Sequence, residues 1–191
     1  RNRNKITLEE QEKLRALRLG VVGLSVGQAT AVTLALEEVG GHLRLADFDT
    51  LELSNMNRLR TGVHNLGIPK VVMTAREIFE INPYANVSLF GEGITKANID
   101  TFLTGEGALD LVFDECDDLQ IKVLLRERAR AFGIPVVMET SDRGLVDIER
   151  FDRERHRPIF HGAVGDLDVD ALAGLSTDDK VPIVLKILGG E

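Results

Sequence analysis

The 191-residue chain is poor in aromatic residues and cysteine and has no long apolar run. Aromatic residues make up 5% of it and tryptophan is absent, so its core must be aliphatic. The single Cys116 excludes an internal disulfide and a zinc site with several thiolate ligands, and no zinc is expected. No apolar run of about 18 residues occurs, so no membrane partner is expected. Together these features indicate a soluble protein of the reducing cytoplasm.

Positive charge is also scarce. The chain has 23 Lys and Arg residues against 31 Asp and Glu residues, a formal net charge of −8, which would repel a nucleic acid duplex. We therefore expect no nucleic acid partner.

The length and the hydrophobic content of 43% fit one globular domain. Because the sequence begins at Arg1 rather than Met, we expect a piece of a longer polypeptide.

Strand and helix patterns alternate through the first 150 residues. Short β-branched runs predict strands at residues 17–24, 42–47, 87–90, 109–114 and 134–140. Apolar stripes predict helices carrying Ala29, Val32, Leu36 and Val39; Val71, Ala75 and Ile78; and Ile121, Leu124, Leu125, Ala129 and Phe132. A weaker helix is expected at residues 97–103. This alternation predicts an α/β, Rossmann-like three-layer fold with a mostly parallel sheet and helices on both faces.

Glycine and proline mark the expected helix ends. Gly40 and Gly41 should stop the first helix, and Pro69 should begin the second. Residues 145–152 have the pattern of an added strand, so we expect antiparallel additions toward the C-terminal end. The last thirty residues carry only short apolar groups, and no element is predicted there.

The most informative segment is DFDTLELSNMNR, residues 47–58, which follows a predicted strand. Asp47 stands about where an acid binds ribose hydroxyls in a nucleotide-binding βαβ unit. The alternative is a solvated carboxylate at the end of a strand. In the simplest interpretation, Ser54 caps a short helix.

The turn before the first long helix reads GVVGLSVGQA, residues 20–29. Backbone N–H groups in such a turn can face a phosphate at the positive end of a helix. The dinucleotide pattern G-x-G-x-x-G is not met, because Ser25 and Gln28 stand where glycines would follow Gly23. The turn therefore either holds phosphate or only packs the helix tightly on the strand.

Two cations follow this segment. Arg58 closes it, and Lys70 comes directly after Pro69 in the first turn of a predicted helix. A cation there opposes the helix macrodipole, a penalty that a bound polyphosphate would remove. We favour phosphate contact over simple solvation for Lys70.

Four acids surround Cys116 at the carboxyl end of a predicted strand, namely Asp114, Glu115, Asp117 and Asp118. One of them is expected to cap the following helix. Crowded carboxylates repel one another, and a Mg²⁺ ion brought in with ATP is the simplest relief. The same anions should raise the pKa of Cys116, so we expect a small buried residue rather than a nucleophile.

Together, the glycine turn, DFDTLELSNMNR, GIPK with Lys70, the Asn82-Pro83 pair and LVFDECDD resemble the ThiF/MoeB/ubiquitin-activating-enzyme family. The resemblance covers residues 17–144, and its specific part is DxDxxxxSNxNR. It implies an ATP-dependent adenylyltransferase that activates the C-terminal carboxylate of a ubiquitin-like or sulfur-carrier protein. The bacterial members that the chain resembles are usually homodimers.

The resemblance also implies roles for individual residues. Asp47 would hold the ribose, Asn55 and Arg58 would contact the phosphates, and Lys70 would stabilise them. Asp117 matches the aspartate on the metal and phosphate side, while Asp118 replaces the usual Asn. The implied nucleotide-binding set is Gly23, Ser25, Val26, Asp47, Asp49, Ser54, Asn55, Arg58 and Lys70. The implied catalytic set is Arg58, Lys70, Asp117 and an N-terminal arginine, best matched by Arg3 and nearly as well by Arg1, which relatives often supply across the dimer.

Two hypotheses follow. In the first, residues 1–150 form a ThiF-type adenylation domain with activity, and residues 151–191 form a C-terminal extension of it, a crossover or linker segment of a longer protein. In the second, the domain binds nucleotide as a scaffold but has lost turnover, because Ser25, Val26 and Gln28 replace glycines and Val26 narrows the phosphate pocket. Oxidoreduction with NAD is disfavoured, because Arg58, Lys70 and Asp117 would go unused.

Overall fold

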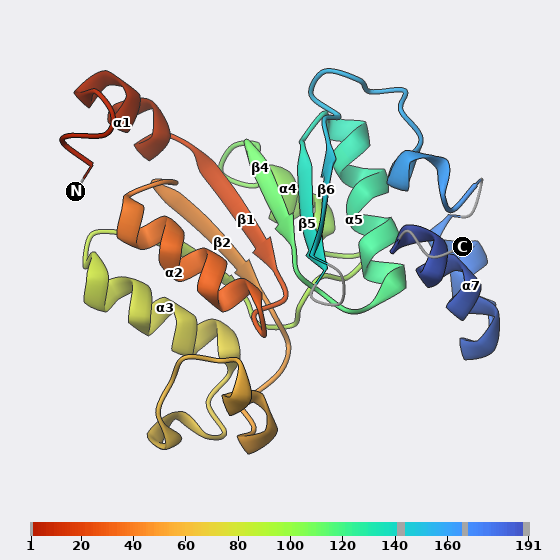
Figure 1. Ribbon diagram of the computed structural model, residues 1–191, viewed down its shortest axis with the longest axis horizontal. Helices are drawn as coiled ribbons and strands as arrows, with labels where there is room; N and C mark the ends of the chain where they lie inside the picture. The colour runs from red at the N-terminus through yellow and green to blue at the C-terminus, as the bar shows by residue number, and fades with distance from the viewer. Residues whose placement is uncertain (1, 141–143, 166–167, 189–191) are drawn as a thin grey trace.

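The computed structural model describes residues 2–140, 144–165 and 168–188. Within them, six strands form one sheet in the order β3-β2-β1-β4-β5-β6 (Figure 1). All neighbouring pairs are parallel except β5 and β6, which are antiparallel. The strands are β1 (Arg18–Val22), β2 (His42–Ala46), β3 (Asn86–Phe90), β4 (Leu111–Asp114), β5 (Val136–Thr140) and β6 (Leu145–Glu149). The predicted α/β class and its antiparallel addition are confirmed.

Helices cover both faces of this sheet. The α-helices are α1 (Leu8–Arg15), α2 (Gly27–Glu37), α3 (Lys70–Ile81), α4 (Ile99–Thr104), α5 (Leu119–Phe132), α6 (Val169–Ala173) and α7 (Thr177–Ile187). Short 3₁₀ turns are η1 (Leu53–Asn57), η2 (Val63–Asn65) and η3 (Ile159–Gly162). Helices α2 and α3 pack side by side on one face, and α4 and α5 cover the other (Figure 1). None of these helices has the length and apolarity that crossing a bilayer requires.

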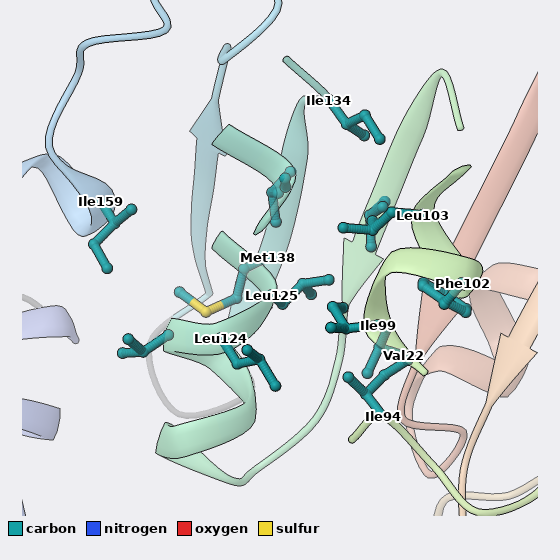
Figure 2. Close-up of a cluster of buried hydrophobic side chains, with 14 of the residues drawn as sticks. Val22, Ile94, Ile99, Phe102, Leu103, Leu124, Leu125, Ile134, Met138 and Ile159 are labelled. Carbon is teal, nitrogen blue, oxygen red and sulfur yellow. The ribbon is translucent and has the colours of Figure 1, made fainter. Parts of the chain in front are cut away.

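The two faces have separate aliphatic cores. Figure 2 shows the cluster on the α4 and α5 side, where Phe102, Leu103, Leu124, Leu125 and Met138 meet.

A β-carbon at Gly20 would lie only 2.7 Å from Leu109 and 2.9 Å from Phe102. The glycine in the middle of β1 therefore lets α4 approach the sheet closely.

The strand register sets up the functional edge of the sheet. Val22, the last residue of β1, pairs with Ala46 at the end of β2 and with Asp114 at the end of β4. The three central strands therefore end together, and the loops that follow them begin side by side. In open parallel sheets, ligands bind at this carboxyl edge.

The apolar stripe predicted for the first long helix is wrong at two of its four residues, because Val32 and Val39 face the core but Ala29 and Leu36 are exposed. The buried residues of α2 are Gly27, Gln28, Ala31, Val32 and Ala35. Close packing rotates the helix onto the sheet at Gly27, where a β-carbon would lie 2.8 Å from a methyl group of Val21. The helix also ends before the expected glycines, because Glu38 takes the left-handed conformation, with φ 54°.

The other helix predictions are confirmed more closely. Pro69 precedes α3, which buries Val71, Ala75 and Ile78 as expected. Helix α5 buries Leu124, Leu125 and Ala129, while Ile121 and Phe132 are partly buried. It also buries Arg126, which the apolar periodicity does not indicate. The segment without a predicted element contains α6 and α7.

Strand β6 has its polar side inside. Asp147 and Glu149 are buried, whereas Val146 and Ile148 are 55% and 52% exposed. The reason is Arg126, whose buried guanidinium forms ion pairs with Glu149 and with Asp114 on β4. It also lies 3.9 Å from the ring centroid of Phe160, a cation–π contact. One buried cation thus ties β4, β6 and η3 together.

We expect Arg126→Met to lower the free energy of unfolding by about 3–5 kcal/mol, because it leaves buried carboxylates without their shared cation. Urea denaturation of the full chain measures this change. The matched control is Arg128→Met on the same helix, which removes an exposed pair with Asp100 and should cost about 0–1 kcal/mol. Equal losses for the two variants would contradict a structural role for the buried network.

Candidate functional site

A cleft of about 210 Å³ lies where β1, β2 and β4 end. Its walls come from the loops after these three strands, the loop after β3, the start of α3 and the first turn of α5. The lining residues are Val22, Gly23, Ser25, Ala46, Asp47, Phe48, Asp49, Lys70, Gly93, Ile94, Glu115, Cys116, Asp117, Asp118 and Ile121. Six of the residues predicted for the site, Gly23, Ser25, Asp47, Asp49, Lys70 and Asp117, therefore share one cleft.

Gly23 makes the turn at the base of this cleft. Its φ is +86°, and a β-carbon there would lie 2.6 Å from the backbone oxygen of Glu115. No other residue type fits both the conformation and the space. The Gly23 N–H donates to the Ala46 carbonyl at 2.8 Å, which fixes the turn against the end of β2.

Asp47 holds the same turn from the next strand. One of its carboxylate oxygens accepts the Leu24 N–H at 2.7 Å, and the other accepts the Asp49 N–H at 2.8 Å. The side chain is thus buried and oriented by two backbone donors. Each oxygen keeps a further lone pair, so the carboxylate can still accept a ligand hydroxyl.

Lys70 brings a cation to the turn. Its side chain is only 3% exposed, and its Nζ lies 2.8 Å from Asp49 Oδ2 and 3.2 Å from Ser25 Oγ. Asp49 therefore supplies the counter-charge that the sequence interpretation assigned to a bound polyphosphate. A half-exposed carboxylate beside a buried ammonium is an exchangeable partner, because an incoming anion can take its place.

The N-terminal end of α2 faces this cation. Val26 occupies the N-cap position, and no side chain caps the helix there. Such a helix end attracts anions through its unpaired N–H groups and its dipole. Ser25 lines the cleft, whereas Val26 does not and borders a neighbouring hollow instead.

Gln28 also turns out differently from its expected role as an obstruction in the turn. It is 2% exposed and absent from the cleft lining. Its Nε2 donates to Glu77 Oε2 on α3 at 2.7 Å, and its Oε1 accepts the Arg60 N–H at 3.3 Å. Of the three replaced glycine positions, only Ser25 borders the cleft.

The structure does not bring Ser54, Asn55 and Arg58 into the cleft lining. The simplest alternative, Ser54 as a helix cap, is wrong as well, because η1 begins after Glu52 and Ser54 lies inside it. Asn55 instead caps the turn by accepting the Glu52 N–H at 3.0 Å. Arg58 is exposed, and its Nη1 donates to Asn57 at 3.0 Å.

Arg3 lies at the other edge of the sheet. It borders a hollow beside α1, which precedes the start of β1, whereas the cleft lies beyond the end of β1 (Figure 1). Within one chain, Arg3 is therefore not part of the cleft. Arg1, the alternative choice, lies outside the described residues.

The acidic cluster divides into different functions. Asp118 caps α5 by accepting the N–H groups of Gln120 and Ile121 at 2.7 and 3.1 Å. Burial alone would raise the pKa of Asp114, but Arg126 and Lys122 outweigh it and hold that pKa below its usual value. Two of the four acids, Asp114 and Asp118, thus have their charge-balancing or hydrogen-bonding partners within the protein. Among the described residues, no three His, Cys, Asp or Glu side chains form a group that could hold a metal.

Burial and the buried charge of Asp114 raise the pKa of both Glu115 and Cys116. Burial, with the nearby Asp114 and Glu139, raises the pKa of Glu115 to about 7. Burial and Asp114 also raise the pKa of Cys116 well above its usual value, as expected, and its Sγ donates to Asp114 Oδ1 at 3.0 Å. The thiol is therefore unsuited to act as a thiolate nucleophile near neutral pH.

Sequence reasoning missed the apolar walls of the cleft. Phe48, 72% exposed, stands between the two acids after β2, and Ile94 and Ile121 complete the walls. Such walls suit the flat face of a nucleobase. The signal available in the sequence was the alternation of Asp47, Phe48 and Asp49, which places an aromatic ring beside two acids at the end of a strand.

Comparison with known proteins gives consistent similarities. The ThiF family model matches residues 1–161. The chain is 57% identical over 188 residues to uncharacterized protein MT1398 of Mycobacterium tuberculosis, covering 98% of this chain and 26% of that protein. It is 27% identical to the molybdopterin-synthase adenylyltransferase of Haemophilus influenzae, covering 81% of this chain and 63% of that protein.

Solved structures agree with these matches. The E. coli tRNA N6-threonylcarbamoyladenosine dehydratase TcdA in complex with ATP superposes with a TM-score of 0.66 at 26% identity. The match covers 73% of this chain and 57% of that one. The chain thus spans between a quarter and just under two thirds of the length of these relatives.

The raised pKa of Glu115 predicts a pH-dependent effect of Glu115→Gln. Folding favours the protonated carboxyl, so its stabilising contribution is complete below pH 4.5, its unfolded pKa, and is lost as the pH rises through about 7. We therefore expect the variant to gain stability relative to the wild type between pH 5 and pH 8, measured by urea denaturation at both values. A difference that does not change with pH would contradict the raised pKa.

Proposed function

The chain belongs to the ThiF family, and on that premise we propose that it activates a carboxylate by adenylation with ATP, as part of a longer protein. The substrate class that we propose is the C-terminal carboxylate of a ubiquitin-like or sulfur-carrier protein. The relatives named as adenylyltransferases support this class. A homodimer in the cytoplasm, with residues 151–191 as an extension of the domain, completes the proposal.

One observation carries the proposal. A buried lysine from α3 reaches the turn after β1, with Lys70 Nζ 3.2 Å from Ser25 Oγ, at the uncapped end of α2. A dinucleotide-binding turn has no need of a lysine there, whereas the phosphates of ATP do. The fit of the cleft to ATP rests on this cation, the oriented carboxylate of Asp47 and the apolar wall at Phe48.

The chemistry requires little from an acid or a base. A carboxylate, already ionised at neutral pH, forms a bond to the α-phosphorus, and pyrophosphate leaves. The chain has to position the reactants and stabilise the developing charge. We assign Asp47 to the ribose hydroxyls, and Lys70, Ser25 and the end of α2 to the phosphates.

Three further roles complete this assignment. Asp117, exposed at the rim of the cleft, would hold the Mg²⁺ that accompanies ATP, a single protein carboxylate being typical of that ion. Asn55 and Arg58 would meet phosphate that extends out of the cleft toward η1. Arg3 would act only on the cleft of a second copy, because the cleft of the same chain lies beyond the end of β1, whereas Arg3 lies near α1, before the start of β1.

The alternative is a nucleotide-binding scaffold that has lost turnover. The observation in its favour is the position of Asn55 and Arg58 outside the cleft lining. The position of Val26 counts against it, because that side chain does not narrow the cleft. ATP binding without adenylation is the signature that distinguishes the scaffold from the enzyme.

We expect Lys70→Met to reduce ATP–pyrophosphate exchange with a carrier protein by about 10- to 100-fold, the loss of one charge-assisted contact to phosphate. Asp117→Asn should reduce the turnover of the same reaction by about 100-fold. The control is Lys13→Met, which removes an exposed lysine on α1 and should leave exchange unchanged. The assay uses the longer protein with candidate carriers from the same genome.

Each of three results would contradict a different part of the proposal. Exchange that is absent with every carrier, while ATP binds in calorimetry, supports the scaffold. Exchange that survives Lys70→Met undiminished removes the assignment of Lys70. Binding of NAD in place of ATP excludes both functions.

A further inference from the structure

Gln28 connects three segments that are far apart in the sequence. It lies in the first turn of α2, where the glycine pattern would place its last glycine. Its Nε2 donates to Glu77 on α3 at 2.7 Å and, over a longer 3.4 Å, to the Arg60 carbonyl. Its Oε1 accepts the Arg60 N–H at 3.3 Å. A glycine there would remove all three contacts.

The Arg60 backbone is the far end of the segment that carries the phosphate-binding candidates. Residues 53–60, here called the η1 segment, contain Asn55 and Arg58. The N–H groups of Arg58 and Leu59 both donate to the Asn55 carbonyl, at 3.1 and 3.0 Å. The segment therefore forms one compact turn, and a contact at its end constrains the residues inside it.

A second anchor holds the η1 segment from below. Leu59 is buried with Leu51 and Met73 in a small core of its own. That apolar contact is non-directional and fixes the depth of the segment rather than its orientation. The directional bonds from Gln28 supply the orientation.

We propose that Gln28 is a positioning residue, which clamps the η1 segment to the phosphate-binding turn and so sets where Arg58 and Asn55 meet the phosphates. This inference rests on the proposed ATP function. On this interpretation, Gln28 in place of a glycine does not impair the phosphate-binding turn. Its side chain holds the η1 segment, and with it Arg58, in a fixed position.

Glu77 is the second member of the clamp. It is half-buried, and its carboxylate accepts the Gln28 amide at the shortest distance in the network. Because the pair consists of one amide and one carboxylate, the two groups can be exchanged between the positions. Gln28→Glu combined with Glu77→Gln recreates an amide-to-carboxylate hydrogen bond with the roles reversed.

The test compares Gln28→Ala, Gln28→Glu and the exchanged double variant in the full chain. Hydrogen exchange measured without nucleotide reports how strongly the backbone amides of the η1 segment are protected, and calorimetry reports the ATP dissociation constant. We expect Gln28→Ala to speed exchange at residues 53–60 and to raise the dissociation constant about tenfold. Gln28→Glu should raise the dissociation constant further, since two carboxylates then face each other. The exchanged double variant should bring the constant back to within about threefold of the wild-type value.

Two controls separate positioning from general destabilisation. Thr33→Ala, at an exposed position of α2, should change neither measurement. Arg58→Ala should weaken ATP binding, and adding Gln28→Ala to it should cause a smaller loss than Gln28→Ala causes alone, because Arg58 is one of the two residues that the clamp positions.

The outcomes are distinct. The inference is overturned if Gln28→Ala loosens the η1 segment without changing ATP affinity, if it leaves that segment unchanged, or if the losses from Gln28→Ala and Arg58→Ala simply add. If the wild-type chain does not bind ATP, the proposed function fails and this inference fails with it, a result seen before any variant is measured.

Discussion

The site depends on one constraint, the common end point of β1, β2 and β4. Because Val22 pairs with both Ala46 and Asp114, the residue after each strand emerges at the same edge. Gly23 then turns in the left-handed conformation against the loop after β4, and Asp47 holds that turn through the Leu24 N–H. The cleft follows from this arrangement, because each of its polar groups is attached to one of these three strand ends or to the helix that follows.

Much of this fold could be predicted from the sequence, and the exceptions have physical reasons. The strands follow from their short β-branched runs, and the α3 stripe follows from helical periodicity, since its buried apolar side chains recur every three or four residues. The buried face of α2 does not, because a glycine and a glutamine at Gly27 and Gln28 occupy it, and neither has an apolar signature. Arg126 was missed for the same reason, since burial of a cation depends on carboxylates from two distant strands.

The candidate site was predicted in part. Asp47, Asp49 and Lys70 could be placed together because strand ends and a helix start converge in any parallel sheet. Arg58 and Asn55 could not, because the conformation of a loop depends on contacts that sequence spacing does not encode. The departures from the glycine pattern were interpreted as obstructions, yet Gln28 bonds to Glu77 and Arg60 outside the cleft.

The central claim is that this cleft takes ATP, and calorimetric titration of the chain with ATP and, separately, with NAD tests it most directly. The account predicts that ATP binds and that NAD does not, because a buried lysine and an uncapped helix end favour a polyphosphate. Binding of NAD without binding of ATP would contradict it.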